Sequence, residues 1–539
     1  MVNGIRITPV LCAAFCAAVS YYTAPYLSPA AAFQSILALL GGTVCLTGFL
    51  RALLSGQAFL FRVQGGEDKK AVMRRKTGDR IRTAHIYVIA AALGFFAGFA
   101  AGRPFPIHTG LPPANITGIY GVMRDDPRIL TNERGTRGMG SVAIRRAIGG
   151  AGKTEASASG TVSVFFPESA IPRLKEFGRG SEVYLEGDFL IHGKGKNTAE
   201  ENSAEAEVSL FRAHSVHIVQ PAPDIEQFRT GIRLTIAERF SQYRWGGLAL
   251  ALLFGIKDTL DSTLAKRYQA AGCSHVLALS GMHLAVVSAV IAFLLKKPLG
   301  LKAAALAGAV FITAYVYLVG AMPSLNRAAI MYLLGAITLF FSLPKDTLSL
   351  LGMAFLLQIG VQPAAGYSLS FILSYLALAG ILALSGPVYT VFRGRLPDFL
   401  GQSLAASIAA FLATAGVSAA FFGVIKPFGI IAGLVIVPLT TVFMIGSLAA
   451  LALVFIAPSA PAWFDTALSL FYQGLESAAS WAAIPPGIKI DRPVPVLLAS
   501  FAIIALVLGA HYMRTRCARM KLCLRRAAAG ERIAGERFG

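Results

Sequence analysis

Two histidines lie in an otherwise apolar stretch of the sequence, at residues 268–287. His275 stands at its start and His283 inside it, with Ser280 and Gly281 between them. On a helix, Ser280 and His283 would share a face, and Gly281 would permit a break or a close helix crossing. Charged groups in hydrocarbon cost about 2.5 kcal/mol or more, so such residues usually face a bundle interior or water. We therefore predict a pore or gate element. The alternative, a buried histidine bonded to a neighbouring carbonyl with glycine for packing, stays open.

Arg327 is the clearest candidate for a contact with phosphate, because it is the arginine at the head of an apolar run. The alternative is that its side chain reaches to the membrane interface from a helix end. Four small polar residues could line a polar path with it, although such residues also join helices by hydrogen bonds. They are Ser324, Asn326, Ser368 and Ser370.

Catalytic chemistry is poorly supported by the same residues. Leu279-Ser280-Gly281 is similar to the Gly-x-Ser-Gly of intramembrane serine proteases, but Ala278 stands in place of the first glycine. A serine nucleophile needs a base within hydrogen-bond reach and an oxyanion hole, and no second helix offers an obvious histidine. HExxH, GxSxG and Walker motifs are missing, and the six cysteines form no cluster with metal spacing. We expect no catalytic residue, no metal and no cofactor.

Long apolar runs must position these residues. The chain has 539 residues, of which 55% are hydrophobic and 14% charged, whereas soluble domains carry about 25% charged residues. A spanning helix needs roughly 20 mostly apolar residues, and the sequence supplies many such runs. We predict a polytopic α-helical membrane protein, with transmembrane helices in residues 1–102 and again in residues 224–513.

The net charge of +21 invites a nucleic-acid interpretation, but its distribution favours topology first. More than half of it lies in a basic loop at residues 51–83 and a basic tail at residues 514–539. Cytoplasmic loops of membrane proteins accumulate Lys and Arg. We therefore expect both segments, and the N-terminus, to be cytoplasmic in a bacterial inner membrane. The tail is cytoplasmic only if residues 428–456 form a broken pair at Pro438 or residues 463–484 also cross; the sequence leaves both open.

Residues 103–223 differ from the rest and have a β pattern. Short alternating or β-branched runs are separated by Gly, Pro and charged clusters, which is typical of a small sandwich or barrel. Four or five strands suit an OB-like barrel, although the pattern does not separate it from other small β folds. Because this insert follows the third span, we expect it to be extracytoplasmic.

Several motifs together resemble one family. The run from Gly272 to His283 is Gly-x-x-His-x-Leu-Ala-x-Ser-Gly-x-His, the hallmark of the ComEC family of competence DNA-uptake channels. Pro323 to Ala328 matches its Pro-Ser-x-x-Arg-Ala, and Gly366 to Phe371 resembles its (Gly/Ser)-Phe-x-Leu-Ser-Phe. Phe421-Phe422 with Phe428 to Pro438 resembles a further family stretch, in which Gly433 replaces the usual asparagine. The resemblance covers about residues 245–457.

The resemblance implies a channel that passes single-stranded DNA into the cytoplasm during natural transformation. It implies that residues 224–513 form the channel domain and that the insert binds single strands, for which the basic candidates are Arg124, Arg128, Arg145 and Arg146. Such binding needs a basic groove with stacking aromatics, and aromatic candidates in the insert are few.

The implied partners are single-stranded DNA, membrane lipid, and separate DNA receptor, nuclease and cytoplasmic helicase proteins; a homodimer stays open. Many family members carry a metallo-β-lactamase-like domain with a His-x-His-x-Asp-His run, which this sequence lacks. We therefore expect no nuclease activity in the polypeptide. The main alternative is a transporter of a small or lipid-linked solute that uses the same buried residues. The β insert favours a macromolecular partner, and the lack of a buried acidic array disfavours proton coupling.

Overall fold

The computed structural model describes most of the chain after residue 107. The described residues are 13–18, 21, 108–132, 135–149, 154–170, 178–190, 210–320, 322–343, 346–456 and 462–528. Most of the predicted N-terminal spans, the basic loop at residues 51–83 and residues 529–539 of the basic tail lie outside them.

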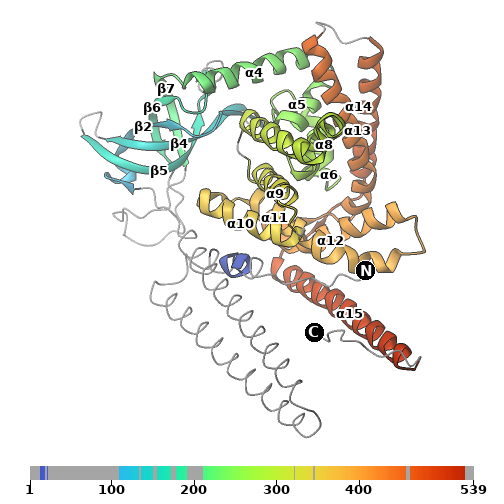
Figure 1. Ribbon diagram of the computed structural model, residues 1–539. Helices are drawn as coiled ribbons and strands as arrows, with labels where there is room; N and C mark the ends of the chain where they lie inside the picture. The colour runs from blue at the N-terminus through green and yellow to red at the C-terminus, as the bar shows by residue number, and fades with distance from the viewer. Residues whose placement is uncertain are drawn as a thin grey trace.

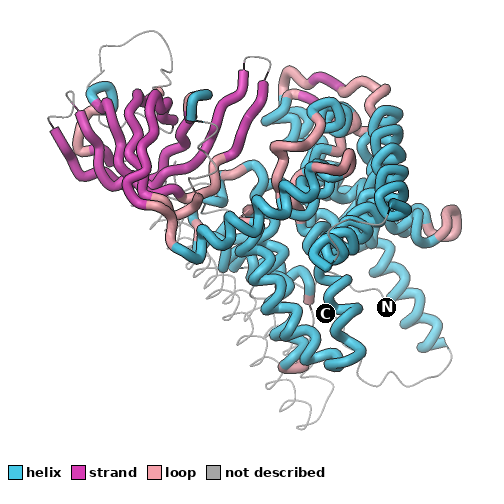
Figure 2. The backbone as a smooth tube through the Cα atoms, turned by 90° about the horizontal axis from the view of Figure 1, so that it is seen from above, coloured by secondary structure: helices cyan, strands magenta, loops and turns pink. Residues whose placement is uncertain are grey.

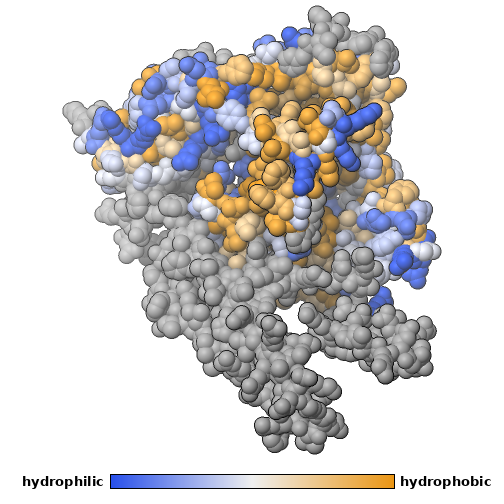
Figure 3. All heavy atoms as spheres, viewed as in Figure 1, coloured by the Kyte–Doolittle hydropathy of each residue, from blue (hydrophilic) through white to orange (hydrophobic). Residues whose placement is uncertain are grey.

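The described chain forms a β-barrel beside a helical domain. Figure 1 shows the barrel at one side and helix α4 (Asp224–Ser241) running from it along the top of the helices. In the view from above, the strands gather on one side and the helices on the other (Figure 2). Hydrophilic residues colour much of the visible barrel, whereas apolar residues dominate the visible helices (Figure 3). The two parts therefore suit different solvents.

Five strands close the barrel. They pair in the order β2, β4, β5, β7, β6 and back to β2, and β5 and β7 are parallel whereas the other pairs are antiparallel. Strands β1 and β3 extend the sheet at β5 and β4. The bounds are β1 (His108–Thr109), β2 (Ile116–Met123), β3 (Arg128–Asn132), β4 (Gly135–Gly149), β5 (Thr154–Phe166), β6 (Glu182–Phe189) and β7 (Leu210–Gln220). A five-stranded Greek-key barrel is the OB architecture, so the expected small OB-like barrel is confirmed.

Alternation of side chains produces the barrel core. Successive residues of a strand point to opposite faces, and β-branched residues such as Ile119, Val142, Val162 and Val183 are fully buried. Gly187 marks a bulge between β6 and β7, where a Cβ would lie 1.9 Å from the carbonyl oxygen of Arg212. Only glycine allows this close approach of two backbones, which helps the sheet to curve and close.

The helical domain contains helices that fit a membrane. The helices after α4 are α5 (Gly246–Phe254), α6 (Ser262–Ala270), α7 (Ser274–Leu277), α8 (Gly281–Val319), α9 (Pro323–Phe340), α10 (Thr347–Val361), α11 (Leu369–Phe392), α12 (Asp398–Phe422), α13 (Gly429–Ile456), α14 (Ala462–Ala482) and α15 (Pro493–Ala528). Within the described ranges, five are long and apolar enough to span a bilayer: α8, α11, α12, α13 and α15. The prediction of a multi-pass helical membrane protein is confirmed.

Two helices differ from simple straight spans. Helix α8 is broken at Gly300, whose φ of 76° departs from helical values, two residues after Pro298. Helix α13 instead continues through Pro438 as one helix, so that stretch is not a broken pair. Glycine and proline are the usual causes of helix kinks, and here only the α8 segment is interrupted.

Acidic residues of α14 are paired with the short helices near α5. Asp465 accepts a hydrogen bond from Nε1 of Trp245 at 2.8 Å, and Glu476 contacts Arg267 at 2.7 Å and Arg244 at 3.4 Å. All nine residues of α5 are buried. A helix that is apolar all round belongs in a protein interior, and the paired acids of α14 help to enclose it.

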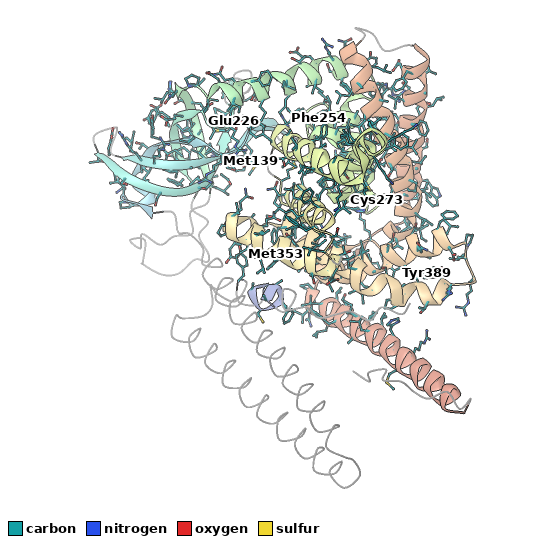
Figure 4. The ribbon with its side chains drawn as sticks, viewed as in Figure 1. Met139, Glu226, Phe254, Cys273, Met353 and Tyr389 are labelled. Atoms are coloured by element: carbon teal, nitrogen blue, oxygen red, sulfur yellow. The ribbon has the colours of Figure 1, made fainter. Side chains whose placement is uncertain are left out.

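An ion-pair cluster joins the barrel to the helices. Arg229 of α4, which is 2% exposed, contacts Asp126 at 2.5 Å and Glu226 at 2.7 Å. Arg233, one turn further, donates from Nη1 to the carbonyl oxygen of Val319 at 2.6 Å, at the end of α8. Figure 4 labels Glu226 where α4 lies beside the barrel. Asp126 follows β2, so the cluster connects a barrel loop, α4 and a membrane helix.

We predict that Asp126→Asn weakens this junction. Burial alone would raise the pKa of Asp126, but the hydrogen bond and charge of Arg229, with Arg233, hold that pKa below its ordinary 3.8. A carboxyl with a lowered pKa stabilises the fold above its ordinary pKa, and this contribution is lost as the pH falls through the lowered value. The variant should lose about 2 kcal/mol at neutral pH and show a flatter melting profile below pH 4. Thermal unfolding of the full chain in detergent measures both.

The matched control is Asp125→Asn. Asp125 is exposed and accepts a hydrogen bond from Ser141 at 2.9 Å, so this change should have little effect. An unchanged melting temperature in Asp126→Asn would show that the cluster does not hold the barrel.

Candidate functional site

Ser280 starts the longest membrane helix with a reciprocal cap. Its hydroxyl accepts a hydrogen bond from the backbone N–H of Met282 at 3.3 Å. The Nδ1 atom of His283 accepts one from the backbone N–H of Ser280 at 3.0 Å. Together these contacts form a capping box at the start of α8, which satisfies N–H groups that a helix end leaves without partners. The sequence predicts that Ser280 and His283 share a helix face, and in the structure the two residues contact each other in this capping box.

His283 is completely buried. Its side chain is 0% exposed, and its Nε2 has no hydrogen-bond partner among the described residues. A buried polar atom without a partner is costly and rare enough to require an explanation, such as an unseen ligand or water. The Nδ1 atom of the imidazole thus forms part of the helix cap, whereas Nε2 is available to a further partner in the interior.

Gly281 brings Arg327 against the first turn of the same helix. A Cβ at Gly281 would lie 2.8 Å from the Nη2 atom of Arg327 and 3.4 Å from the Cβ of Ala328. Any larger residue would therefore displace the guanidinium. The first turn of a helix carries a partial positive charge, so the contact adds a full positive charge to a position that is already electropositive.

Arg327 has no carboxylate partner among the described residues, although it is only 7% exposed. Its guanidinium lies over the ring of Tyr375 at 5.8 Å, and its Nε has no hydrogen-bond partner. An uncompensated buried charge is strongly unfavourable. The combination of a helix N-terminus, a buried guanidinium and an open imidazole nitrogen is suited to an anionic group.

Further hydrogen bonds hold this site in place. The hydroxyl of Ser324 donates to the carbonyl of Leu279 at 2.6 Å, which ties the start of α9 to the turn before α8. The amide of Gln358 donates to the carbonyl of Pro323 at 3.0 Å, and the hydroxyl of Tyr375 donates to Gln358 Oε1 at 2.9 Å. Gln358 and Tyr375 escaped the sequence analysis. A glutamine inside an apolar run was the signal that could have found them.

The remaining predicted pore residues have no hydrogen bond to this cluster among the described contacts. His275, in α7, is exposed by solvent accessibility but lies near enough to His283 for the two imidazoles to interact electrostatically. Asn326, which precedes Arg327 on α9, donates to Gln362 Oε1 at 3.4 Å. Ser368 caps α11 by accepting from the N–H of Phe371 at 3.2 Å, and Ser370 is exposed. The fold brings together Ser280, Gly281, His283, Ser324 and Arg327.

In the Ser280–His283 pair, a possible base lies next to a serine hydroxyl. A hydrolase requires such a base, and the sequence alone offered no obvious one. The Ser280 Oγ atom lies 2.9 Å from His283 Nδ1, within the reach of a general base. The base comes from the same helix rather than from a second one. However, both groups also serve as the helix cap, and Nε2 has no orienting carboxylate among the described residues. The geometry is therefore explained by capping.

Lys426 fastens the segment that leads into the site. Its Nζ donates to the carbonyls of Gln269 at 2.7 Å and Ala270 at 2.9 Å, at the end of α6. Gly272, with a φ of 75°, follows at once, and a Cβ there would lie 2.9 Å from the Cβ of Lys426. Lysine at a helix C-terminus satisfies free carbonyls. The sequence analysis missed Lys426, because its partners are distant in sequence.

The basic candidates in the barrel are largely neutralised. Arg145 contacts Glu182 at 2.6 Å, and Arg146 contacts Glu155 at 3.5 Å. Arg124 is exposed, whereas the side chain of Arg128 lies outside the described residues. Exposed ion pairs contribute little to stability, but they lower the net charge that a phosphate would meet.

Comparison with known proteins finds similarity over the helical domain. Residues 252–516 match the sequence profile of the family described as "Competence protein". The chain is 26% identical over 276 residues to the "ComE operon protein 3" of Bacillus subtilis (strain 168), which covers 49% of this chain and 34% of that protein. It is 25% identical over 331 residues to an "Uncharacterized protein" of Aquifex aeolicus (strain VF5), which covers 60% of this chain and 76% of that one. The chain therefore spans about a third of the length of the Bacillus relative.

A solved structure of a nucleic-acid-binding protein was also matched to part of the chain. It is the small single-stranded DNA-binding protein of Streptomyces coelicolor, at 12% identity over 19% of this chain and 90% of that one. The TM-score is 0.14, which is too low to show a shared fold. The OB assignment of the barrel rests on its strand order instead.

We predict that Ser280→Ala destabilises the start of α8. Loss of an N-cap side chain costs about 1 kcal/mol, and here the change also removes a partner of His283 Nδ1. Ser288→Ala, in the same helix, is the control, because the half-buried Ser288 only bonds the carbonyl of Ala285. Thermal unfolding in detergent should separate the two variants. Equal melting temperatures would contradict the capping role.

Proposed function

Because residues 252–516 belong to the competence protein family, we propose that this chain is an inner-membrane channel that passes single-stranded DNA into the cytoplasm during natural transformation. The observation that carries the proposal is Arg327, a buried cation without a carboxylate partner at the first turn of α8. A polyanion in transit would supply the missing negative charge.

The chemistry of the cluster suits a phosphodiester. Guanidinium groups bind phosphate oxygens through two parallel hydrogen bonds, and a helix N-terminus adds backbone N–H donors. Conduction requires a site that attracts each group and still releases it. A single arginine with partial helix charges is weaker than a cage of several cations, so each phosphate could give way to the next.

The helix cap supports a passive role for Ser280 and His283 rather than hydrolysis. We propose that the polypeptide performs no catalysis, and that separate DNA receptor, nuclease and cytoplasmic helicase proteins complete uptake. In this arrangement the N-terminus and the tail at residues 514–539 are cytoplasmic, and the barrel insert at residues 103–223 is extracytoplasmic. Residues 224–513 are the channel domain.

We predict that Arg327→Met abolishes DNA uptake without harming the fold. Removal of a buried charge that binds an anion costs 2–5 kcal/mol of interaction, so transformation should fall on the order of a hundredfold. Stability should stay equal or rise, since an apolar side chain replaces an uncompensated buried charge. Transformation frequency with labelled DNA measures the first effect, and thermal unfolding of the purified chain measures the second.

Two further variants make the test specific. Arg327→Lys keeps the charge but loses the planar fork, so uptake should fall less than in Arg327→Met. Arg395→Met removes an exposed arginine that bonds only the carbonyl of Val391, and uptake should be unchanged. Normal uptake in Arg327→Met at normal protein levels would refute the channel assignment. A small-anion transporter would show normal DNA uptake together with loss of solute uptake.

A further inference from the structure

Four planar side chains form a continuous row across the outside of the barrel. They come from four neighbouring strands and are cross-strand neighbours: Arg146 of β4 pairs with Tyr120 of β2, Tyr120 pairs with Tyr184 of β6, and Tyr184 pairs with His217 of β7. We call this row the stacking ladder. Adjacent strands lie about 4.8 Å apart, so the members of the ladder follow one another across four strands.

The ladder points away from the barrel core. The neighbours of Tyr184 along β6, Val183 and Leu185, are both 0% exposed. Tyr184 itself is half-buried, and the flanking Arg146 and His217 are exposed. Because side chains alternate along a strand, the whole ladder shares the outer face.

Two neighbouring pairs of the ladder are stacked on each other. The Arg146 guanidinium sits 5.8 Å from the centre of the Tyr120 ring, and the rings of Tyr184 and His217 are 27° from parallel at 6.2 Å. Gly118 makes this possible, since a Cβ there would lie 2.8 Å from the hydroxyl of Tyr184 and 3.1 Å from its ring. Glycine on a neighbouring strand leaves room for an aromatic ring to lie across that strand.

The charges around the ladder are already engaged. Glu182 accepts hydrogen bonds from Tyr120 at 2.8 Å and from Arg145 at 2.6 Å, and Glu186 accepts one from Ser215 at 2.7 Å. The two arginines beside and within the ladder are each paired with a carboxylate, Arg145 with Glu182 and Arg146 with Glu155, which weakens the positive field that would attract phosphates. Flat aromatic surfaces bind bases by stacking, which does not depend on sequence.

We propose that the stacking ladder binds unpaired bases of single-stranded DNA on the face formed by β4, β2, β6 and β7. OB folds usually bind oligonucleotides on their second and third strands, which here are β4 and β5. On β5 the outward residues are mostly small and polar, such as Ser159, Thr161 and Ser163, and Phe165 is the aromatic one. The barrel thus offers its aromatic platform on β2 and β6, next to β4 but away from β5. The inference rests on the proposed function for its ligand, single-stranded DNA.

Binding of a fluorescent oligo-dT to the full chain in detergent tests the ladder. Tyr184→Ala should weaken binding roughly tenfold, because base stacking on one ring is worth about that much by alanine substitution. Tyr184→Phe keeps the ring and should bind like the natural chain. Phe165→Ala is the matched control, since it removes an outward aromatic from β5 and should leave binding unchanged. Duplex DNA should compete poorly, because its bases are paired.

Salt dependence separates stacking from phosphate contacts. Binding through 6–10 phosphates weakens by about 10³–10⁵ between 50 and 200 mM salt, whereas binding through the ladder should weaken less than about tenfold. Normal binding by Tyr184→Ala, or its loss in Phe165→Ala alone, would overturn the proposal.

The outcome is independent of the channel test. If ladder variants bind normally while Arg327→Met abolishes uptake, the ladder fails and the channel stands. If ladder variants lose binding while Arg327→Met takes up DNA normally, the channel fails and the ladder stands. Melting temperatures of Tyr184→Ala and Tyr184→Phe show whether any loss reflects unfolding.

Discussion

A buried guanidinium needs a nearby negative charge. Two buried arginines of this chain differ in whether the fold supplies one. Arg229 is held by Asp126 and Glu226, whereas Arg327 has no carboxylate among the described residues. Burial of an ion is tolerated only when close partners replace water. Arg229 therefore has a structural role, whereas Arg327 still requires a negative charge inside the helical domain.

The Arg229 cluster decides how the two parts of the molecule are joined. It connects the loop after β2 with α4, while Arg233 closes the carbonyl end of α8. The same helix α8 begins at the Ser280 cap, beside Arg327. One helix, broken at Gly300, thus links the barrel junction to the candidate anion site. Near the end of this helix the buried Arg229 is paired with carboxylates. At its start the buried Arg327 has no such partner among the described residues.

The barrel separates two properties that nucleic-acid binding often combines. Its strand order is that of an OB fold, but its basic residues Arg145 and Arg146 are paired with carboxylates. The aromatic residues of the stacking ladder instead lie on β2, β6 and β7, outside the β4–β5 pair that OB folds usually use. Electrostatic attraction and base stacking contribute independently to single-strand binding, so an aromatic surface can hold a strand loosely. Loose binding suits a protein that must pass its ligand onward.

The sequence by itself determined the class of protein and the local motifs. Apolar run length requires a lipid environment, the period of two in residues 103–223 requires strands, and the spacing of Ser280 and His283 sets a local cap. These features depend on residues close together in the chain. Only the tertiary structure decided that Arg327 rests on Gly281, that Lys426 holds the turn before Gly272, and that Tyr120 and Tyr184 are neighbours. The physical reason is that periodicity states which face of an element is apolar. It does not state the register of strands or which helix ends meet, because these follow from packing between distant segments.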